Sequence, residues 1–191
     1  DSVVLEIGCG IGAISGLILK NTPLGYFVGA DISNETIEFV RKKYSHFHNA
    51  EFIVSDMTQF YHSKKFDMVV LPDVLEHIPK EAHGNIFKTI RTLIKEDGVV
   101  FINIPEPRFL EWFHKHQPQD LQIIDQALHT NELLNSIYPH GFYLESLETY
   151  SLFFTEPDYQ SLILKPKREI AKIERKSKLS VLLNGLKLRL S

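Results

Sequence analysis

Cysteine is nearly absent from this 191-residue sequence, and long apolar runs are missing altogether. The single thiol, Cys9, has no partner for an internal disulfide, so a reducing compartment is expected. No apolar run reaches the roughly 18 residues of a membrane span, and because the sequence starts with the pattern of a strand, no secretory signal is expected. The sequence has no cysteine pair, and its histidines lack the paired spacing of a zinc site, so no metal site is expected. We therefore predict a cytoplasmic protein without a metal cofactor.

Charge is divided unevenly between a large acidic part and a short basic end. The net charge is −3, but residues 165–191 hold nine lysines and arginines against two glutamates, a net +7 that leaves −10 for the rest. An acidic body excludes nucleic acid as an expected partner, because such a site needs a basic face. Leucines recur at helical spacing in the basic end, at Leu179, Leu182, Leu183, Leu186 and Leu190. This tail is predicted either to lie on an anionic membrane surface or to pack on the domain or a second copy, and both alternatives stay open.

Apolar runs typical of strands alternate with amphipathic stretches typical of helices. The alternation predicts an α/β fold with a parallel sheet and helices on both faces. Strands are expected at residues 3–7, 26–32, 51–54, 66–71, 98–105, 141–150 and 159–164. Helices are expected from residue 13 and at residues 34–45, 79–95 and 130–138.

The first expected strand contains an acidic residue, Glu6, which is followed by Gly8, Gly10 and Gly12. Glycines let a backbone turn tightly and approach a ligand closely. A helix beginning at Ala13 would also present its N-terminal N–H groups to an anionic ligand. The loop is therefore predicted to bind a nucleotide cofactor. One reading is a dinucleotide fingerprint, Gly-x-Gly-x-x-Ala, with an acidic residue about 20 positions further on to hold a ribose.

The segments after the next strands favour a second reading. Asp31 ends the second strand, Ser55-Asp56-Met57 follows the third, and Leu71-Pro72 ends the fourth. With the Glu6-x-Gly8-x-Gly10-x-Gly12 loop, these segments resemble, in order and spacing, the class I S-adenosylmethionine-dependent methyltransferases over residues 3–105.

This resemblance implies a Rossmann-like, doubly wound sheet of seven strands, mostly parallel with an antiparallel C-terminal strand. It implies S-adenosylmethionine as cofactor and S-adenosylhomocysteine as product. The glycine loop would cradle the methionine end, with Cys9 packed beneath the ligand. Asp31 would hold the ribose, and the adenine would lie among Ile32, Asp56 and Met57. The implied cofactor-binding residues are Glu6, Gly8, Cys9, Gly10, Gly12, Asp31, Ile32, Asp56, Met57, Leu71 and Pro72.

Residues 105–129 are unusually rich in aromatic and titratable side chains. A long connection at this place is predicted to form a lid or an acceptor-binding element. Methyl transfer to a hydroxyl benefits from a general base, and histidine is the common choice near neutral pH. His77 and His129 are the predicted bases. Simple helix packing by the aromatic residues, with solvated histidines, is the plainer alternative.

A narrower resemblance rests on Ile104-Pro105-Glu106-Pro107, residues 121–126 and 129–130, and Asp158-Tyr159-Gln160. These segments are similar to a subgroup of bacterial methyltransferases associated with surface-glycan synthesis. The resemblance implies O-methylation of a sugar on a small-molecule or glycan acceptor. A lipid-linked glycan would place the basic tail peripherally on the inner face of the membrane.

We interpret residues 1–164 as a methyltransferase domain, with an acceptor-binding or lid insertion at about 105–129, and residues 165–191 as a basic amphipathic tail. Methyltransferases of this class usually have helices before the first strand, so we expect an N-terminal segment to be missing here. An NAD-dependent oxidoreductase is the alternative enzyme, although it leaves Ser55-Asp56-Met57 unexplained. A catalytically inactive methyltransferase-like scaffold is the non-enzymatic alternative.

Overall fold

The computed structural model describes residues 1–170, 173–175, 177 and 180. Its strands are β1 (Val3–Ile7), β2 (Tyr26–Asp31), β3 (Ala50–Val54), β4 (Phe66–Pro72), β5 (Ile94–Pro105), β6 (Phe142–Tyr150) and β7 (Tyr159–Pro166). Its α-helices are α1 (Ala13–Asn21), α2 (Asn34–Lys43), α3 (Lys80–Leu93), α4 (Pro107–His116) and α5 (Thr130–Ile137). Three short 3-10 helices are η1 (Leu75–His77), η2 (Pro118–Asp120) and η3 (Tyr138–His140).

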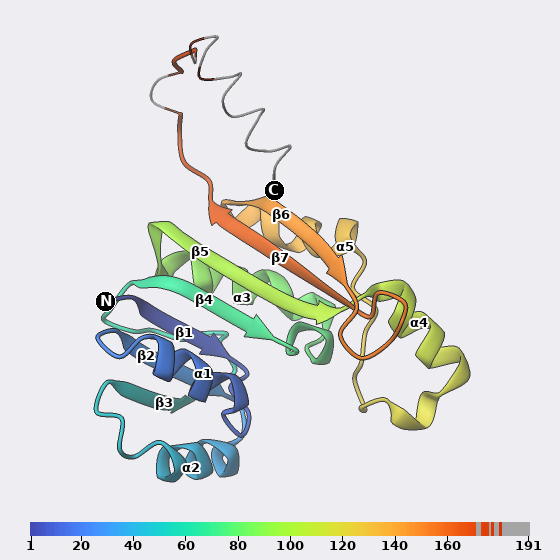
Figure 1. Ribbon diagram of the computed structural model, residues 1–191, viewed down its shortest axis with the longest axis horizontal. Helices are drawn as coiled ribbons and strands as arrows, with labels where there is room; N and C mark the ends of the chain where they lie inside the picture. The colour runs from blue at the N-terminus through green and yellow to red at the C-terminus, as the bar shows by residue number, and fades with distance from the viewer. Residues whose placement is uncertain (171–172, 176, 178–179, 181–191) are drawn as a thin grey trace.

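The seven strands form one sheet in the order β3-β2-β1-β4-β5-β7-β6 (Figure 1). The first five strands are parallel to one another, and β7 is antiparallel to both β5 and β6. The predicted doubly wound sheet with an antiparallel C-terminal strand is therefore confirmed. Because β1 lies between β2 and β4, the loops that follow these three strands meet at one edge of the sheet.

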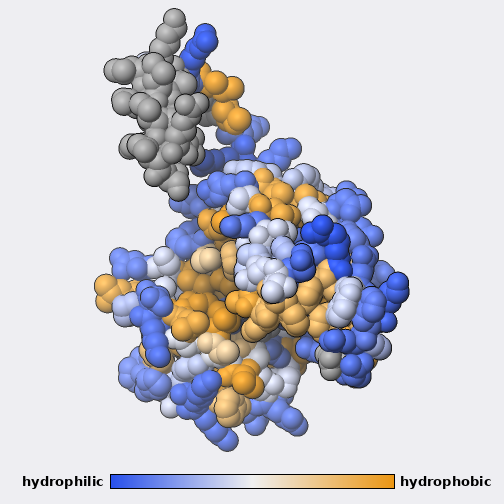
Figure 2. Space-filling view, turned by 45° about the vertical axis from the view of Figure 1, so that its right-hand side comes forward, coloured by the Kyte–Doolittle hydropathy of each residue, from blue (hydrophilic) through white to orange (hydrophobic). Residues whose placement is uncertain are grey.

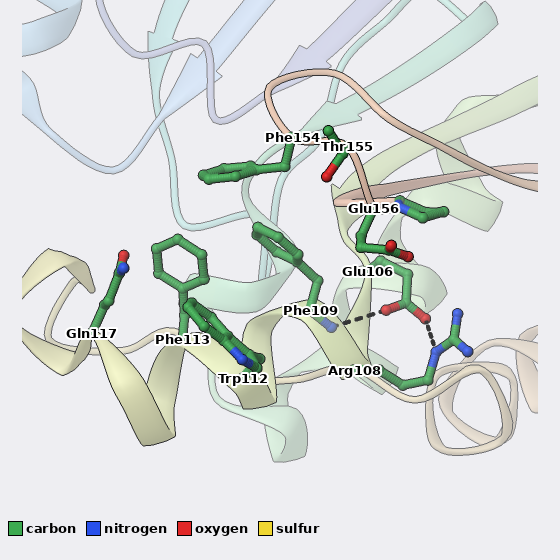
Figure 3. A pocket seen from close by; sticks show the side chains of 10 residues that line it. Glu106, Arg108, Phe109, Trp112, Phe113, Gln117, Phe154, Thr155 and Glu156 are labelled. Atoms are coloured by element: carbon green, nitrogen blue, oxygen red, sulfur yellow. Dashed lines mark hydrogen bonds and ion pairs between the residues drawn. The ribbon is translucent and has the colours of Figure 1, made fainter.

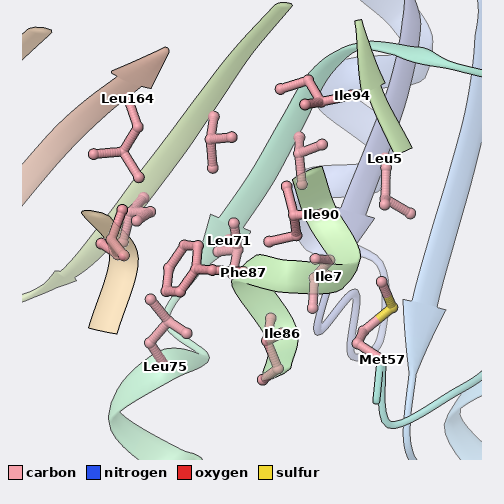
Figure 4. Close-up of a cluster of buried hydrophobic side chains, with 14 of the residues drawn as sticks. Leu5, Ile7, Met57, Leu71, Leu75, Ile86, Phe87, Ile90, Ile94 and Leu164 are labelled. Atoms are coloured by element: carbon pink, nitrogen blue, oxygen red, sulfur yellow. The ribbon is translucent and has the colours of Figure 1, made fainter. Parts of the chain in front are cut away.

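Helices cover both faces of the sheet, and each face has its own core cluster. Consecutive residues of a strand point to opposite faces: Leu5 and Val28 belong to the larger cluster, and Val4 and Phe27 to the smaller one. The larger cluster includes side chains of α3 and α5 (Figure 4). The smaller cluster includes side chains of α1 and α2.

Two segments differ from the sequence-based expectation. The helix expected to reach residue 95 ends at Leu93, because Ile94 is extended (φ −80°, ψ 147°) and pairs with Phe66 as the start of β5. The connection after β5 contains a ten-residue helix, α4, whose first turn is capped by the Glu106 carboxylate accepting from the Phe109 N–H. Part of this segment is therefore helical, and both the lid and the helix-packing alternatives for residues 105–129 stay predictions.

Strand β7 continues to Pro166, past the expected domain end at residue 164. The tail leucines Leu179, Leu182, Leu183, Leu186 and Leu190 lie outside the described residues, so the amphipathic tail stays a prediction. Within the described part of the chain, no helix has the length and apolar character needed to cross a membrane.

Candidate active site

The glycine loop between β1 and α1 is held against the end of β2 by backbone hydrogen bonds. The N–H groups of Gly8 and Cys9 both donate to the Ala30 carbonyl, at 2.8 and 3.0 Å. The Asp31 carboxylate accepts from the Gly10 N–H through Oδ2 and from the Ser33 N–H through Oδ1, both at 2.9 Å. A carboxylate has about four lone-pair positions, so Asp31 retains acceptor capacity for a ligand.

Of the three loop glycines, Gly10 is the one that faces open space. Its φ is +48°, and a Cβ built on it would meet nothing within 4 Å. By contrast, a Cβ on Gly8 would lie 2.6 Å from a Val74 methyl carbon, and one on Gly12 would lie 2.6 Å from the Tyr44 ring. Gly8 and Gly12 therefore allow close packing of protein groups. The space beside the Gly10 backbone is unfilled, and a ligand can occupy it; we call this space the open floor.

Two predicted site residues lie beneath this loop. Glu6 is 1% exposed, and its Oε2 accepts from the Ser15 hydroxyl of α1 at 2.5 Å. Burial raises the pKa of Glu6 to about 7. Cys9 is buried in the smaller core cluster, and burial raises the pKa of its thiol to about 12. The structure thus gives Glu6 a role in joining β1 to α1, and Cys9 a packing role.

The other predicted cofactor contacts lie after the neighbouring strands. Ile32 follows Asp31 and is 74% exposed, as a cover for a flat ligand requires. Asp56 is exposed, and its carboxylate accepts from the N–H and hydroxyl of Thr58. The Met57 side chain is buried in the larger core cluster, and its backbone is left-handed (φ 64°). Met57 can therefore offer a ligand its backbone rather than its side chain.

At the end of β4, the Leu71 side chain is fully buried in the larger core cluster and Pro72 is half-buried. These residues can line a ligand with backbone atoms alone. Beyond them, the contact of Val74 with Gly8 brings the segment after β4 directly against the glycine loop.

A polar cluster surrounds that segment at the ends of β4, β5, β6 and β7. Tyr159 hydrogen-bonds the Asp73 carboxylate, and the Tyr150 hydroxyl donates to Asn103 Oδ1 at 2.6 Å. The rings of Tyr150 and Tyr159 stack with centroids 6.1 Å apart. Asp73 is left-handed (φ 50°), and its N–H donates to the Asn103 carbonyl. Desolvation raises the pKa of Asp73.

Glu76 and the predicted base His77 lie next in this segment, in η1. Glu76 is 1% exposed, and its Oε2 has no hydrogen-bond partner within the described residues. Burial raises the pKa of Glu76 to about 8. His77 Nδ1 lies 2.7 Å from the Ile124 carbonyl oxygen, and Nε2 lies 3.8 Å from Glu76 Oε1. Because a carbonyl only accepts, Nδ1 carries a proton and the neutral ring keeps a lone pair on Nε2.

The second predicted base, His129, precedes α5 and is paired with a different element. Its Nε2 lies 2.8 Å from Glu111 Oε1 of α4, and both side chains are substantially exposed. Val74 links the glycine loop to the His77 segment, whereas the described side-chain partner of His129 is Glu111 of α4. The structure thus brings the segment that holds His77 against the glycine loop and pairs His129 with α4.

Sequence reasoning missed the part that Glu76, Asn103, Tyr150 and Tyr159 take in this site. Glu76 was visible in the sequence next to His77, but a carboxylate just before a helix is also typical of a helix cap. Asn103, Tyr150 and Tyr159 lie on β5, β6 and β7, and only the order of strands in the sheet brings them together.

Comparisons with known proteins agree with this geometry. Residues 4–98 match the family model of the methyltransferase domain. The chain carries a class I S-adenosylmethionine-dependent methyltransferase domain. The comparisons support this class but not the glycan-associated subgroup, which stays a prediction.

Two curated relatives of this methyltransferase domain illustrate the match. A malonyl-[acyl-carrier protein] O-methyltransferase of Ilyobacter polytropus is 29% identical over 100 residues, which cover 52% of this chain and 38% of the relative. The (S)-coclaurine N-methyltransferase of Papaver somniferum is 23% identical over 155 residues, covering 80% of this chain and 41% of the relative. The chain thus spans about two fifths of the length of these relatives.

Solved structures share the fold of the methyltransferase domain. A SAM-dependent methyltransferase from Methanosarcina mazei superimposes with a TM-score of 0.74 at 18% identity, covering 88% of this chain and 94% of that one. The magnesium protoporphyrin IX methyltransferase of Synechocystis with bound S-adenosylhomocysteine superimposes with a TM-score of 0.66 at 20% identity, covering 87% and 74%.

The residues of the methyltransferase domain fit its cofactor, S-adenosylmethionine. The open floor at Gly10 gives room for a ligand, and Asp31 beside it has acceptor capacity for hydroxyl groups. Among the residues that the structure describes, no group of three or more His, Cys, Asp or Glu side chains could hold a metal ion.

The buried Glu76 carboxyl predicts a pH-dependent stability. Its pKa, raised from 4.5 to about 8, makes the unfolded chain lose this proton before the folded protein does. The free energy of unfolding therefore falls as pH rises between these values, by about 1.4 kcal/mol for each pKa unit of the shift. Glu76→Gln stays neutral, so it should gain stability relative to the parent between pH 5 and pH 8, as measured by urea unfolding.

Glu132→Gln is the matched control. The hydrogen bond from Lys80 lowers the pKa of Glu132, so this carboxyl does not titrate between pH 5 and pH 8. Parallel pH profiles for the parent and Glu76→Gln would show that Glu76 is ionised in the folded protein, contrary to the expectation.

Proposed function

We propose that this protein transfers a methyl group from S-adenosylmethionine to an oxygen atom of a small acceptor. The observation that carries the proposal is the contact of Val74 with Gly8. Because Val74 belongs to the segment that holds His77, a cofactor at Gly10 and a base at His77 would lie on the same edge of the sheet. A cofactor site and a proton acceptor side by side are what methyl transfer to a hydroxyl requires.

The cofactor supplies a methyl group on a positively charged sulfur, so the protein's task is alignment of the acceptor and removal of a proton. In this proposal Gly8, Gly10 and Gly12 cradle the methionine end and Asp31 holds the ribose. Ile32, the Asp56 carboxylate and the Met57 backbone hold the adenine. Glu6 and Cys9 support the loop from below, and Leu71 and Pro72 line it with backbone atoms.

His77 is proposed as the general base. Its Nε2 lone pair can take the acceptor's hydroxyl proton, because the Ile124 carbonyl fixes the other ring proton on Nδ1. Asp125 Oδ1 lies 3.8 Å from Nδ1, so the charged ring that results gains a nearby carboxylate. His129 is the second candidate base, supported only by its place in the connection after β5.

The domain limits, acceptor and location stay proposals of the same kind. Residues 1–164 would be the catalytic domain, with residues 105–129 contributing to acceptor binding, and residues 165–191 a membrane-binding or self-associating tail. Relatives include a malonyl-[acyl-carrier protein] O-methyltransferase and a ubiquinone biosynthesis O-methyltransferase. A sugar hydroxyl on a glycan, as the narrower sequence resemblance implies, is one acceptor of this chemistry, and a cytoplasmic location is compatible with it.

The cofactor part of the proposal is tested by calorimetric titration with S-adenosylmethionine, S-adenosylhomocysteine and NAD in parallel. We expect saturable, micromolar binding of the first two and no heat from NAD, because Asp56 and Met57 have no role in the dinucleotide alternative. Binding of NAD alone would establish the oxidoreductase reading. No binding of any of the three would favour the inactive scaffold.

The base is tested by comparing His77→Ala with His129→Ala in transfer of labelled methyl groups to a panel of phenols and methyl glycosides. His77→Ala should lower kcat by about 100-fold or more and leave the affinity for S-adenosylhomocysteine unchanged. His129→Ala, which removes an exposed ion pair with Glu111, should keep at least half of the activity. The reverse order of effects would move the base to His129.

A further inference from the structure

A pocket of about 450 Å³ lies between α4 and the segment 151–157 that joins β6 to β7. Its volume falls in the range of small-molecule sites, roughly 300–1,000 Å³. Figure 3 shows the aromatic rings of Phe109, Trp112 and Phe113, from α4, on one side, and Phe154 from the opposite segment. None of these residues has a part in the cofactor site or the polar cluster.

The rings form a connected aromatic wall. Ring centroids are 4.9 Å apart for Phe109 and Phe113, and 4.8 Å for Phe109 and Phe154. Phe154 also meets Phe113 edge to face at 5.7 Å. Trp112 packs edge to face on Phe113 at 5.5 Å, and Trp112 and Phe154 are still 46% and 50% exposed. Large aromatic side chains left exposed around a hollow mark a binding site rather than a core.

The surroundings of the pocket are apolar on one side and acidic on the other. Figure 2 shows apolar side chains gathered in the middle of the face that its view brings forward, with hydrophilic ones around them. At the pocket itself, the Glu106 carboxylate accepts from Arg108 Nε at 2.7 Å, and Glu156 interacts electrostatically with the same guanidinium. Two carboxylates therefore face one cation, so the lining carries an excess of negative charge, which disfavours an anionic ligand.

The pocket adjoins the polar cluster through the ends of β5 and β7. The Glu106 N–H donates to the Asp158 carbonyl, and the Asp158 carboxylate accepts from the N–H groups of Leu152 and Phe153. Phe153 in turn packs edge to face on Tyr159 of the polar cluster, with centroids 6.0 Å apart. A ligand held by the aromatic wall thus lies at the same edge of the sheet as Asp73 and His77.

We infer that this pocket binds the acceptor through a flat aromatic ring that carries no negative charge. The inference rests on the proposed function for the statement that the bound ring belongs to the acceptor. The aromatic wall offers ring faces and edges, which pair well with another aromatic ring. A sugar ring instead needs several hydrogen-bond partners; in this lining Gln117 and Thr155 are neutral, and Glu106 and Arg108 are already hydrogen-bonded to each other. The wall therefore favours a phenolic acceptor over a sugar.

Trp112 makes the test direct, because it is the single tryptophan of the sequence and lines the pocket. Its fluorescence, excited at about 295 nm, is followed during titration with tyramine, 4-hydroxyphenylacetate and methyl β-D-glucopyranoside. We expect a saturable change with tyramine, at least tenfold weaker binding of 4-hydroxyphenylacetate, and no change with the glucoside. Saturation with the glucoside and none with tyramine would overturn the inference and favour the sugar acceptor.

Substitutions in the lining test whether tyramine binds in this pocket. Phe154→Leu keeps much of the apolar volume but removes the ring, and Phe109→Ala opens the opposite wall; each should weaken tyramine binding at least tenfold. Phe39→Ala is the control, because Phe39 is 52% exposed on α2 and outside the pocket lining. Equal tyramine affinity in the parent, Phe154→Leu and Phe109→Ala would overturn the inference.

The two proposals fail separately in these measurements. If tyramine binds at Trp112 but S-adenosylmethionine gives no calorimetric binding, the pocket is supported as a ligand site and the proposed function is rejected. If S-adenosylmethionine binds but Trp112 does not respond to tyramine, the proposed function stands and the aromatic acceptor is rejected.

Discussion

The contact between Val74 and the backbone of Gly8 is the constraint on which the site depends. Strand order forces it: β1 lies between β2 and β4, so the loop after β1 has the loop after β4 as its neighbour. A Cβ at position 8 would come within 2.6 Å of Val74, so only glycine allows the two loops to meet this closely. The glycine loop and the segment that holds His77 therefore lie against each other.

The features that the sequence predicts well are those set by neighbouring residues. The glycine loop, the carboxylate at the end of β2 and the alternation of strands and helices are local patterns, and the sheet confirms the fold that they imply. The three glycines nevertheless have different structural roles. Gly8 and Gly12 make room for Val74 and Tyr44, and the open position is Gly10. The sequence cannot separate them, because the packing partners are distant in the chain.

The features that the sequence predicts poorly depend on distant packing. Glu76 reads as a helix cap, yet it is buried with one oxygen unpaired among the described residues. Met57 was expected to cover the adenine, but its side chain lies in the core. The aromatic residues of α4 become a pocket wall only when Phe154, about forty residues later, folds against them. The sequence does not show burial or such pairings.

The cofactor is proposed to bind at the open floor beside Gly10 and to the carboxylate of Asp31. Calorimetric affinity of Asp31→Ala for S-adenosylhomocysteine tests it most directly, with Glu35→Ala, an exposed carboxylate of α2, as control. Loss of charge-assisted hydrogen bonds to the ribose should cost about 2 kcal/mol or more, a weakening of roughly thirtyfold, while the control binds like the parent. Unchanged affinity in a folded Asp31→Ala variant would show that Asp31 does not bind the cofactor.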